Sequence, residues 1–123
     1  MIITPPKYDY AVDEVIRVVD ADTFDLTVGW EVDHGFYLKE RKRWTTRFRL
    51  YGFDAVESSS ETGHIATAFV IQWFEERKGL VRVATHKPDN FGRWLADVYS
   101  FDGYLKDALL DAGFQKVGSK WNI

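Results

Sequence analysis

The sequence predicts an α+β fold, a five-stranded β-barrel with a helix after the third strand and a short C-terminal helix. Three observations support this prediction. A segment of strict period-two alternation lies in the first third of the chain, a helical apolar period occupies the middle, and two shorter strand-like runs follow it. The chain of 123 residues, 46% of them hydrophobic, is long enough for one core and too short for two. We therefore expect residues 1–123 to form a single domain.

Three strands are expected before the first helix. Residues 1–11 contain a Pro-Pro pair and are predicted to form an irregular lead-in, whereas 12–19 are rich in β-branched residues, which favour a strand. Residues 24–32 alternate apolar and polar side chains, as a half-buried strand requires. The Asp-His-Gly triplet at 33–35 has turn chemistry, so 36–51 is predicted to return as the second arm of a long hairpin.

The second half of the chain is expected to form a helix, two strands and a short helix, at residues 63–78, 80–85, 94–99 and 106–112. The apolar stripe expected on the first helix consists of Ile65, Ala68, Phe69 and Trp73, with Ala66, Val70 and Phe74 beside it. Five strands with a helix after the third are typical of an OB-fold barrel, an architecture that commonly binds oligonucleotides. A fold by itself does not establish a function.

Composition narrows the class of protein. The chain has no cysteine, which excludes disulfides, thiolate zinc sites and cysteine nucleophiles. It has no run of about 18 apolar residues that could span a bilayer, and its first residues do not resemble a signal peptide. We therefore predict an intracellular protein that does not enter the membrane.

The charge distribution leaves two interpretations open. The formal net charge of −3 argues mildly against a nucleic-acid partner, yet residues 38–49 carry six basic residues and one glutamate. This segment is either a solvated hairpin arm or a local positive surface for a polyanion. In the second case Lys39, Arg41 and Arg43 are candidate substrate-binding residues.

Acidic residues stand at two predicted strand ends. Asp20 and Asp22 lie between the first two strands, and Asp54 follows the third. Aspartates in turns ordinarily cap backbone amides. If neighbouring strands bring Asp22 and Asp54 together, however, two carboxylates and a main-chain carbonyl would make a hard oxygen site for Ca²⁺ or Mg²⁺. Such an ion would neutralise a phosphate and polarise its P–O bonds.

Two arginines and a glutamate accompany these acids. Arg49 lies five residues before Asp54, and Arg93 follows a Phe-Gly pair in a later turn. The planar guanidinium can donate two parallel hydrogen bonds to a phosphate, and Glu57 could then orient or deprotonate an attacking water. The alternative is that Arg49 pairs with Glu57 as a surface salt bridge and Arg93 is a turn residue.

Three stretches in register, VIRVVDADTFDL, RFRLYGFDAVE and DNFGRWLADVY, resemble the signature sequences of the thermonuclease, or staphylococcal-nuclease-like (SNase-like), family. The resemblance covers roughly residues 14–117. It implies an OB-fold barrel and a Ca²⁺-dependent nuclease that hydrolyses DNA and RNA. In that family water attacks phosphorus and the 5′-oxygen leaves, so the products carry 3′-phosphate ends.

The resemblance implies a role for each residue that matches a functional position of the family. The implied metal ligands are Asp22, Asp54 and the backbone carbonyl of Ala55, with Asp20 as an acid behind them. The implied catalytic residues are Arg49, Glu57 and Arg93. Phe91 and Trp121 are the implied substrate-binding residues: Phe91 keeps the ring but not the hydroxyl of a common family tyrosine, and Trp121 could stack on a base. The metal implied is Ca²⁺, although two carboxylates also suit Mg²⁺ or Mn²⁺.

The chain departs from the family pattern at several positions. Ala21 stands where the family usually has glycine, which would cost about 1 kcal/mol if that position needed a positive φ. Val56 replaces a common proline, and the arm at 36–43 is extended and basic. A second hypothesis is therefore kept, in which the chain is a non-catalytic OB-fold module that binds nucleic acid or protein.

Overall fold

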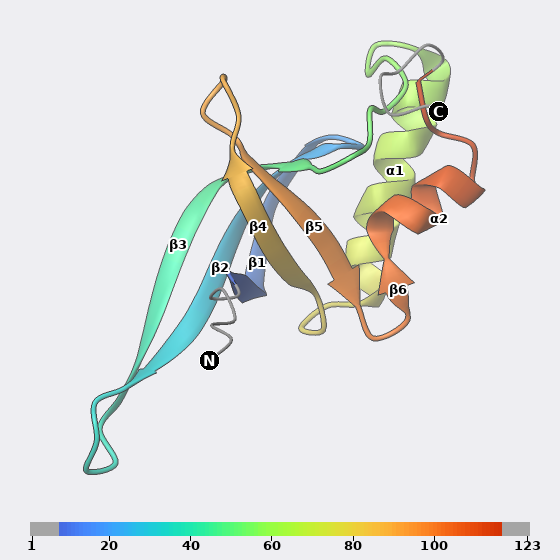
Figure 1. Ribbon diagram of the computed structural model, residues 1–123. Helices are drawn as coiled ribbons and strands as arrows, with labels where there is room; N and C mark the ends of the chain where they lie inside the picture. The colour runs from blue at the N-terminus through green and yellow to red at the C-terminus, as the bar shows by residue number, and fades with distance from the viewer. Residues whose placement is uncertain (1–7, 117–123) are drawn as a thin grey trace, which may run out of the picture.

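The computed structural model describes residues 8–116, which form six strands and two helices (Figure 1). In chain order the elements are β1 (Asp9–Asp20), β2 (Thr23–Asp33), β3 (Lys39–Leu50), α1 (Glu61–Glu76), β4 (Arg82–Pro88), β5 (Trp94–Ser100), β6 (Gly103–Tyr104) and α2 (Leu105–Asp111). The predicted order of three strands, a helix, two strands and a helix is confirmed. The two-residue β6 was not predicted, because two residues carry no periodicity.

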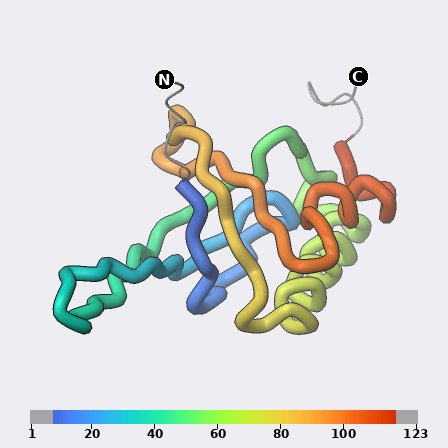
Figure 2. Tube along the Cα trace, turned by 60° about the horizontal axis from the view of Figure 1, so that its bottom comes forward, coloured from blue at the N-terminus to red at the C-terminus, as the bar shows by residue number. Residues whose placement is uncertain are grey.

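The strands close into a barrel. Strand β1 pairs with β2 and β4, β2 pairs with β3, and β4 pairs with β5, all antiparallel. Strand β3 then pairs in parallel with β5, from Phe48 opposite Trp94 to Leu50 opposite Ala96, which joins the two sides of the sheet. The predicted OB-like α+β barrel of five strands is thereby confirmed. Figure 2 shows the closed barrel, with both helices on the same side of it.

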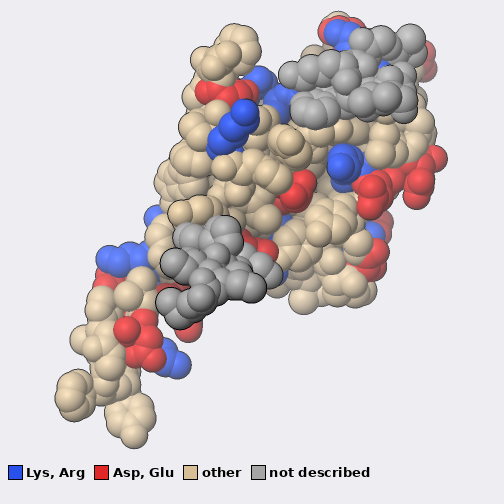
Figure 3. Space-filling model, viewed as in Figure 1, with Lys and Arg blue, Asp and Glu red and all other residues tan. Residues whose placement is uncertain are grey.

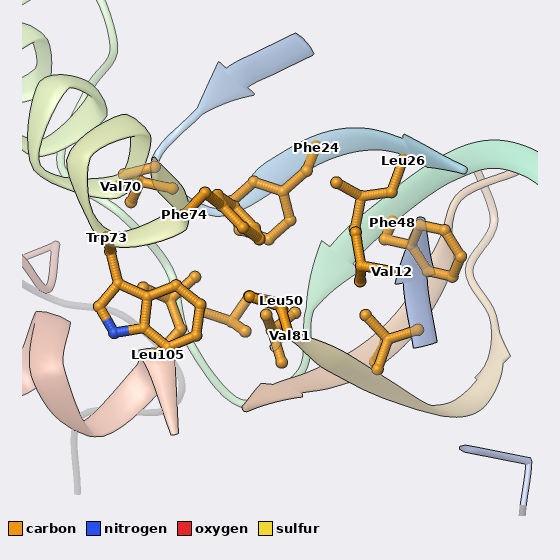
Figure 4. Close-up of a cluster of buried hydrophobic side chains, with 14 of the residues drawn as sticks. Val12, Phe24, Leu26, Phe48, Leu50, Val70, Trp73, Phe74, Val81 and Leu105 are labelled. Atoms are coloured by element: carbon orange, nitrogen blue, oxygen red, sulfur yellow. The ribbon is translucent and has the colours of Figure 1, made fainter. Parts of the chain in front are cut away.

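The core fills the barrel and continues under α1 (Figure 4). The alternation of β2 places Phe24, Leu26 and Val28 inside, each with no exposed surface. The rings of Phe24 and Phe74 meet edge to face with their centroids 5.4 Å apart, which joins β2 to α1. Each fully buried side chain of this size contributes roughly 2 kcal/mol through the hydrophobic effect.

Helix α1 turns a different stripe to the barrel from the one predicted. Its buried residues are Gly63, Ala66, Val70, Trp73 and Phe74, whereas Ile65 is 54% exposed. Placing Ile65 and Ala68 on the buried stripe was wrong, because apolar residues nearly encircle this segment and periodicity alone does not choose between neighbouring stripes. Within residues 8–116, neither helix has the length and apolar character needed to span a bilayer.

Strand β1 begins at Asp9, so the irregular lead-in predicted for residues 1–11 was wrong for its last three residues. Residues 9–11 pair with 82–84 of β4, and this long-range pairing had no local signal in the sequence. Residues 1–7 lie outside the described part of the chain.

The β2–β3 hairpin projects from the barrel as an arm, defined here as residues 30–43 (Figure 1). Its two strands remain in register from Trp30 opposite Lys42 to Asp33 opposite Lys39. Two ion pairs link the base of the arm to β1, since both Arg41 and Arg43 bind Asp13.

Candidate active site

Seven predicted site residues line one cavity of about 350 Å³ at the end of β2 and β3 opposite to the arm. They are Asp20, Asp22, Arg49, Asp54, Ala55, Glu57 and Arg93. They come from the end of β1 and the turn after it, the end of β3, the loop that follows β3 and the turn before β5. Residues remote from one another in the sequence therefore share one small volume.

Backbone pairing explains why the two aspartates meet. The amide of Leu50 donates to the carbonyl of Asp22 at 2.8 Å, which fixes the β1–β2 turn beside the end of β3. Gly52, at φ 76°, takes a left-handed conformation in which the chain turns after β3. The amide of Ala55 then donates to Asp22 Oδ2 at 3.0 Å, and the loop carrying Asp54 is held against the first turn.

Arg49 bridges the two aspartates. Its Nη1 lies 3.1 Å from Asp22 Oδ2, and its Nη2 forms an ion pair with Asp54 Oδ1. Nη1 also donates to the carbonyl of Phe53 at 2.7 Å. Only 15% of the Arg49 side chain is exposed, so these contacts are largely screened from water. The alternative that Arg49 pairs with Glu57 is wrong.

The donor set fits a divalent cation. Two carboxylates that both reach one guanidinium line the same cavity, and carboxylate and carbonyl oxygens are the ligands that Ca²⁺ and Mg²⁺ take. Within residues 8–116 the carbonyl of Ala55 accepts no hydrogen bond, so its lone pairs remain available. In the same part of the chain no group of three or more His, Asp or Glu side chains gathers as a metal site. The candidate site thus needs the carbonyl as its third protein ligand.

Glu57 is paired with Lys116, at 2.7 Å between Oε1 and Nζ. This hydrogen bond lowers the pKa of Glu57, which favours the carboxylate form. Lys116 is brought to the cavity by backbone pairing, because its amide donates to the carbonyl of Asp54 at 2.8 Å. Sequence analysis missed Lys116, since it follows α2 and only the tertiary fold brings it beside Glu57.

Arg93 is held by Asp89. Its Nε and Nη2 both lie 2.7 Å from Asp89 Oδ2, while Oδ1 of the same carboxylate accepts the amides of Phe91 and Arg93. Burial by itself would raise the pKa of Asp89, but these amide and guanidinium hydrogen bonds lower it. Asp89 thus builds the turn and positions Arg93 at once. Its role was missed because an aspartate in a turn is unremarkable in a sequence.

Four other predicted residues within the described part of the chain do not line the cavity. Phe91 is 83% exposed, and the centroid of its ring lies 5.2 Å from the Arg93 guanidinium carbon. Lys39, Arg41 and Arg43 lie along the arm, and about ten residues of strand, roughly 30 Å, separate the cavity from Lys39. The structure therefore does not bring them to the site. Trp121 lies outside the described residues.

Ala21 does not have the positive φ that would favour glycine at its position. Within residues 8–116, the non-glycine residues with positive φ are Phe36 and Tyr37, and Ala21 is not among them. Its side chain is 2% exposed and belongs to the core. The alanine therefore packs under the turn that carries Asp22, and the possible cost of a missing glycine does not arise.

The start of α1 supports the loop that carries Glu57. Ser60 Oγ accepts the amide of Gly63 at 2.9 Å, as an N-cap does, and donates to the carbonyl of Glu57 at 2.6 Å. Gly63 itself packs against this loop, and a Cβ at Gly63 would lie 1.8 Å from the Glu57 carbonyl oxygen. Glycine is required here because of this close approach.

Gly63→Ala should therefore destabilise the protein by about 1–3 kcal/mol, as overpacking does. Helix propensity alone would give the opposite sign, a gain of about 1 kcal/mol. Thermal and urea unfolding of the two proteins would measure the difference. Ala68→Gly, at an exposed position of the same helix, should lose only about 1 kcal/mol. Unchanged or higher stability in Gly63→Ala would contradict this packing.

A comparison with known proteins adds no family assignment. No protein-family model matches the chain, and no curated protein is significantly similar to it.

Proposed function

We propose that this protein is a metal-dependent nuclease of the thermonuclease type, which hydrolyses phosphodiester bonds of DNA or RNA. One observation carries the proposal. Asp22, Asp54, Arg49, Glu57 and Arg93, which come from the three stretches that resemble the family, all line a single cavity of about 350 Å³. This chemistry needs ligands for the metal, ligands for the phosphate, and a carboxylate that orients or deprotonates the attacking water.

The charge of the cavity supports a metal requirement. Its lining carries four carboxylates and three cationic groups, namely Asp20, Asp22, Asp54, Glu57, Arg49, Arg93 and Lys116. The formal sum is one negative charge, so an anionic phosphodiester would be repelled from the cavity as it stands. A divalent cation reverses that sign. Asp22, Asp54 and the carbonyl of Ala55 would hold it, and when bound it would neutralise the phosphate and polarise its P–O bonds.

The arginines and Glu57 would act on the phosphate and the water. Arg49 and Arg93 would donate hydrogen bonds to the non-bridging oxygens and stabilise the added charge of five-coordinate phosphorus, by about 3 kcal/mol for each well-placed group. Glu57 would orient or deprotonate the water that attacks phosphorus. A bond forms between the water oxygen and phosphorus, the bond to the 5′-oxygen breaks, and that oxygen takes up a proton. The products are a 3′-phosphate and a 5′-hydroxyl.

A second candidate function is a non-catalytic OB-fold module that binds nucleic acid or protein. One observation favours it: Arg49, Glu57 and Arg93 each already have an ion-pair partner within the chain. Catalysis requires Arg49 and Glu57 to exchange these partners for substrate or water. The second candidate requires no such exchange, and it predicts binding without cleavage.

One experiment distinguishes the nuclease from the non-catalytic module. The purified protein is incubated with single-stranded DNA, once with Ca²⁺ and once with a chelator. We expect cleavage that depends on Ca²⁺, and a loss of on the order of 10²-fold or more in Asp54→Asn, because a metal ligand is removed. Asp25→Asn is the matched control, since Asp25 forms the same kind of pair, with Arg47, but does not line the cavity.

Nearly unchanged cleavage in Asp25→Asn is the result expected of this control. Binding without cleavage, in Ca²⁺, Mg²⁺ and Mn²⁺ alike, would favour the second candidate. Cleavage that persists in chelator would contradict the metal site itself.

A further inference from the structure

The end of the arm exposes three apolar side chains. Phe36 and Tyr37 are fully exposed, at 102% and 101%, and Leu38 is 63% exposed. We call these three residues the tip. In Figure 3 the end of the arm forms an uncharged protrusion, and the acidic and basic side chains of the arm lie nearer to the barrel. An apolar protrusion that no other described residue of its own chain covers is typical of an interaction site.

The conformation of the tip opposes its own sequence. Phe36 and Tyr37 have positive φ values, 52° and 67°, and the amide of Leu38 donates to the carbonyl of Gly35 at 2.9 Å. These are features of a type I′ hairpin turn, whose two central positions favour Asn-Gly. Bulky aromatic residues are strained there. The chain thus holds two aromatic rings outward at a cost in stability, although a better turn sequence exists.

A partly apolar groove of about 400 Å³ lies between β1 and α1. The register of β1 with β4 ends at Ala11, opposite Arg82. The part of β1 that follows is not paired with β4 and borders the groove beside α1. The apolar lining includes Val15, Ile16 and Ile71, which are 36%, 51% and 48% exposed. The groove can therefore accept side chains from outside.

The tip cannot enter the groove of its own molecule. The groove starts at Val12, which pairs with Val28, and it continues along β1 toward Val18. The arm leaves the barrel in the other direction, and its tip lies about eight residues of strand, roughly 25 Å, beyond Val28. A contact between tip and groove must therefore join two molecules.

The charges around the tip and the groove are complementary. Lys39 and Asp33 flank the tip, and besides the paired Asp13 the groove carries Glu14, Arg17, Glu75 and Lys78. None of these six, Asp13 aside, forms an ion pair within the described part of the chain. A basic and an acidic group beside the tip can thus meet opposite charges at the groove, which favours a second copy of this chain as the partner.

We propose that the tip of one molecule binds in the groove of a second copy. Each copy then offers one tip and one groove, so two copies can exchange tips in a closed two-fold dimer, or each copy can bind a different neighbour in an open chain or a larger ring. The contact is smaller than a standard interface, so we expect weak association, with a Kd on the order of 10⁻⁵–10⁻³ M. The proposal does not depend on the nuclease function, because neither surface touches the candidate active site.

Sedimentation equilibrium of the full chain tests this proposal. The wild type should show an average mass that rises with concentration. Phe36→Asn with Tyr37→Gly should abolish the rise and also increase the melting temperature, since it supplies the favoured turn residues. Ile71→Arg, in the groove, should abolish it as well. Ile65 has a similar exposure, 54% against 48%, on the same helix but outside the groove, so Ile65→Arg is the matched control and should associate like the wild type.

Mixing the two defective variants is the decisive step. The tip variant keeps an intact groove and the Ile71→Arg variant keeps an intact tip, so together they should form one-to-one dimers although each alone is monomeric. A wild type that stays monomeric up to millimolar concentration would overturn the proposal, and so would a mixture that fails to dimerise. Dependence on the tip but not on Ile71 would overturn it too.

Discussion

Arg49→Ala should lower the rate of Ca²⁺-dependent cleavage by on the order of 10³-fold, and at the same time it should strengthen Ca²⁺ binding. The rate falls because a phosphate ligand is lost from a largely water-excluded position, where its charge acts most strongly. Affinity rises because the Arg49 guanidinium bridges Asp22 and Asp54, the two carboxylates that would hold the ion. Arginine and metal ion thus compete for the same oxygens in the absence of substrate.

Single-turnover cleavage and calorimetric titration with Ca²⁺ measure the two effects. Without the ion Arg49→Ala should also be less stable than the wild type, since Asp22 and Asp54 lose their shared cation. Saturating Ca²⁺ should therefore raise its melting temperature more than that of the wild type. Arg47→Ala is the matched control, because Arg47 pairs with Asp25 on the same two strands and does not line the cavity. A loss of rate below tenfold in Arg49→Ala would count against the proposed role.

Arg93→Ala should cost about 10²–10³-fold in rate, with little loss of stability. The fold should persist because Asp89 would still accept the amides of Phe91 and residue 93, and these bonds form the turn. Arg93→Lys should recover only part of the rate, since an ammonium group cannot donate two parallel hydrogen bonds to a phosphate.

Arg82→Ala provides the comparison for Arg93. Arg82 pairs with Asp9 on the barrel surface, so its removal should leave the rate nearly unchanged. Equal effects of the two substitutions would indicate a general electrostatic contribution of surface arginines, and would contradict a specific contact between Arg93 and the phosphate.

Much of the fold could be predicted from local pattern. The alternation in β2 determines which side chains enter the core, and Gly79 and Gly113, both with positive φ, follow the ends of α1 and α2. Long-range pairing could not be predicted in this way. The first residues of β1 join the sheet only because β4 lies beside them, and the buried stripe of α1 is selected by contact with the barrel.

The candidate site could be predicted in part, because some of its residues lie where strands end and others are placed only by tertiary contacts. Strand pairing places Arg49, near the end of β3, beside the turn that carries Asp22, whereas Asp54 lies in the loop after β3 and is held there by the bond from the Ala55 amide to Asp22. Their ion pairing was not expected, because a sequence does not show which of several opposite charges an arginine selects. Lys116 had no local signal at all, since its place beside Glu57 depends on the segment after α2.

The basic arm shows where charge counting alone misleads. Arg41 and Arg43 share the carboxylate of Asp13, and Lys42 binds Glu40, so part of the positive charge is compensated within the chain. The end of the arm is a protruding apolar surface. Its length and its distance from the cavity suit contact with another molecule better than contact with the scissile phosphate.

Product analysis in ¹⁸O-labelled water tests the central claim most directly. If Asp22 and Asp54 hold a metal ion and water attacks phosphorus with departure of the 5′-oxygen, mass spectrometry of cleaved single-stranded DNA should find one ¹⁸O in each new 3′-phosphate and none in the 5′-hydroxyl ends. The label should require Ca²⁺ and disappear in Asp54→Asn. Intact DNA under all metal conditions, or products with 5′-phosphate ends, would contradict the account.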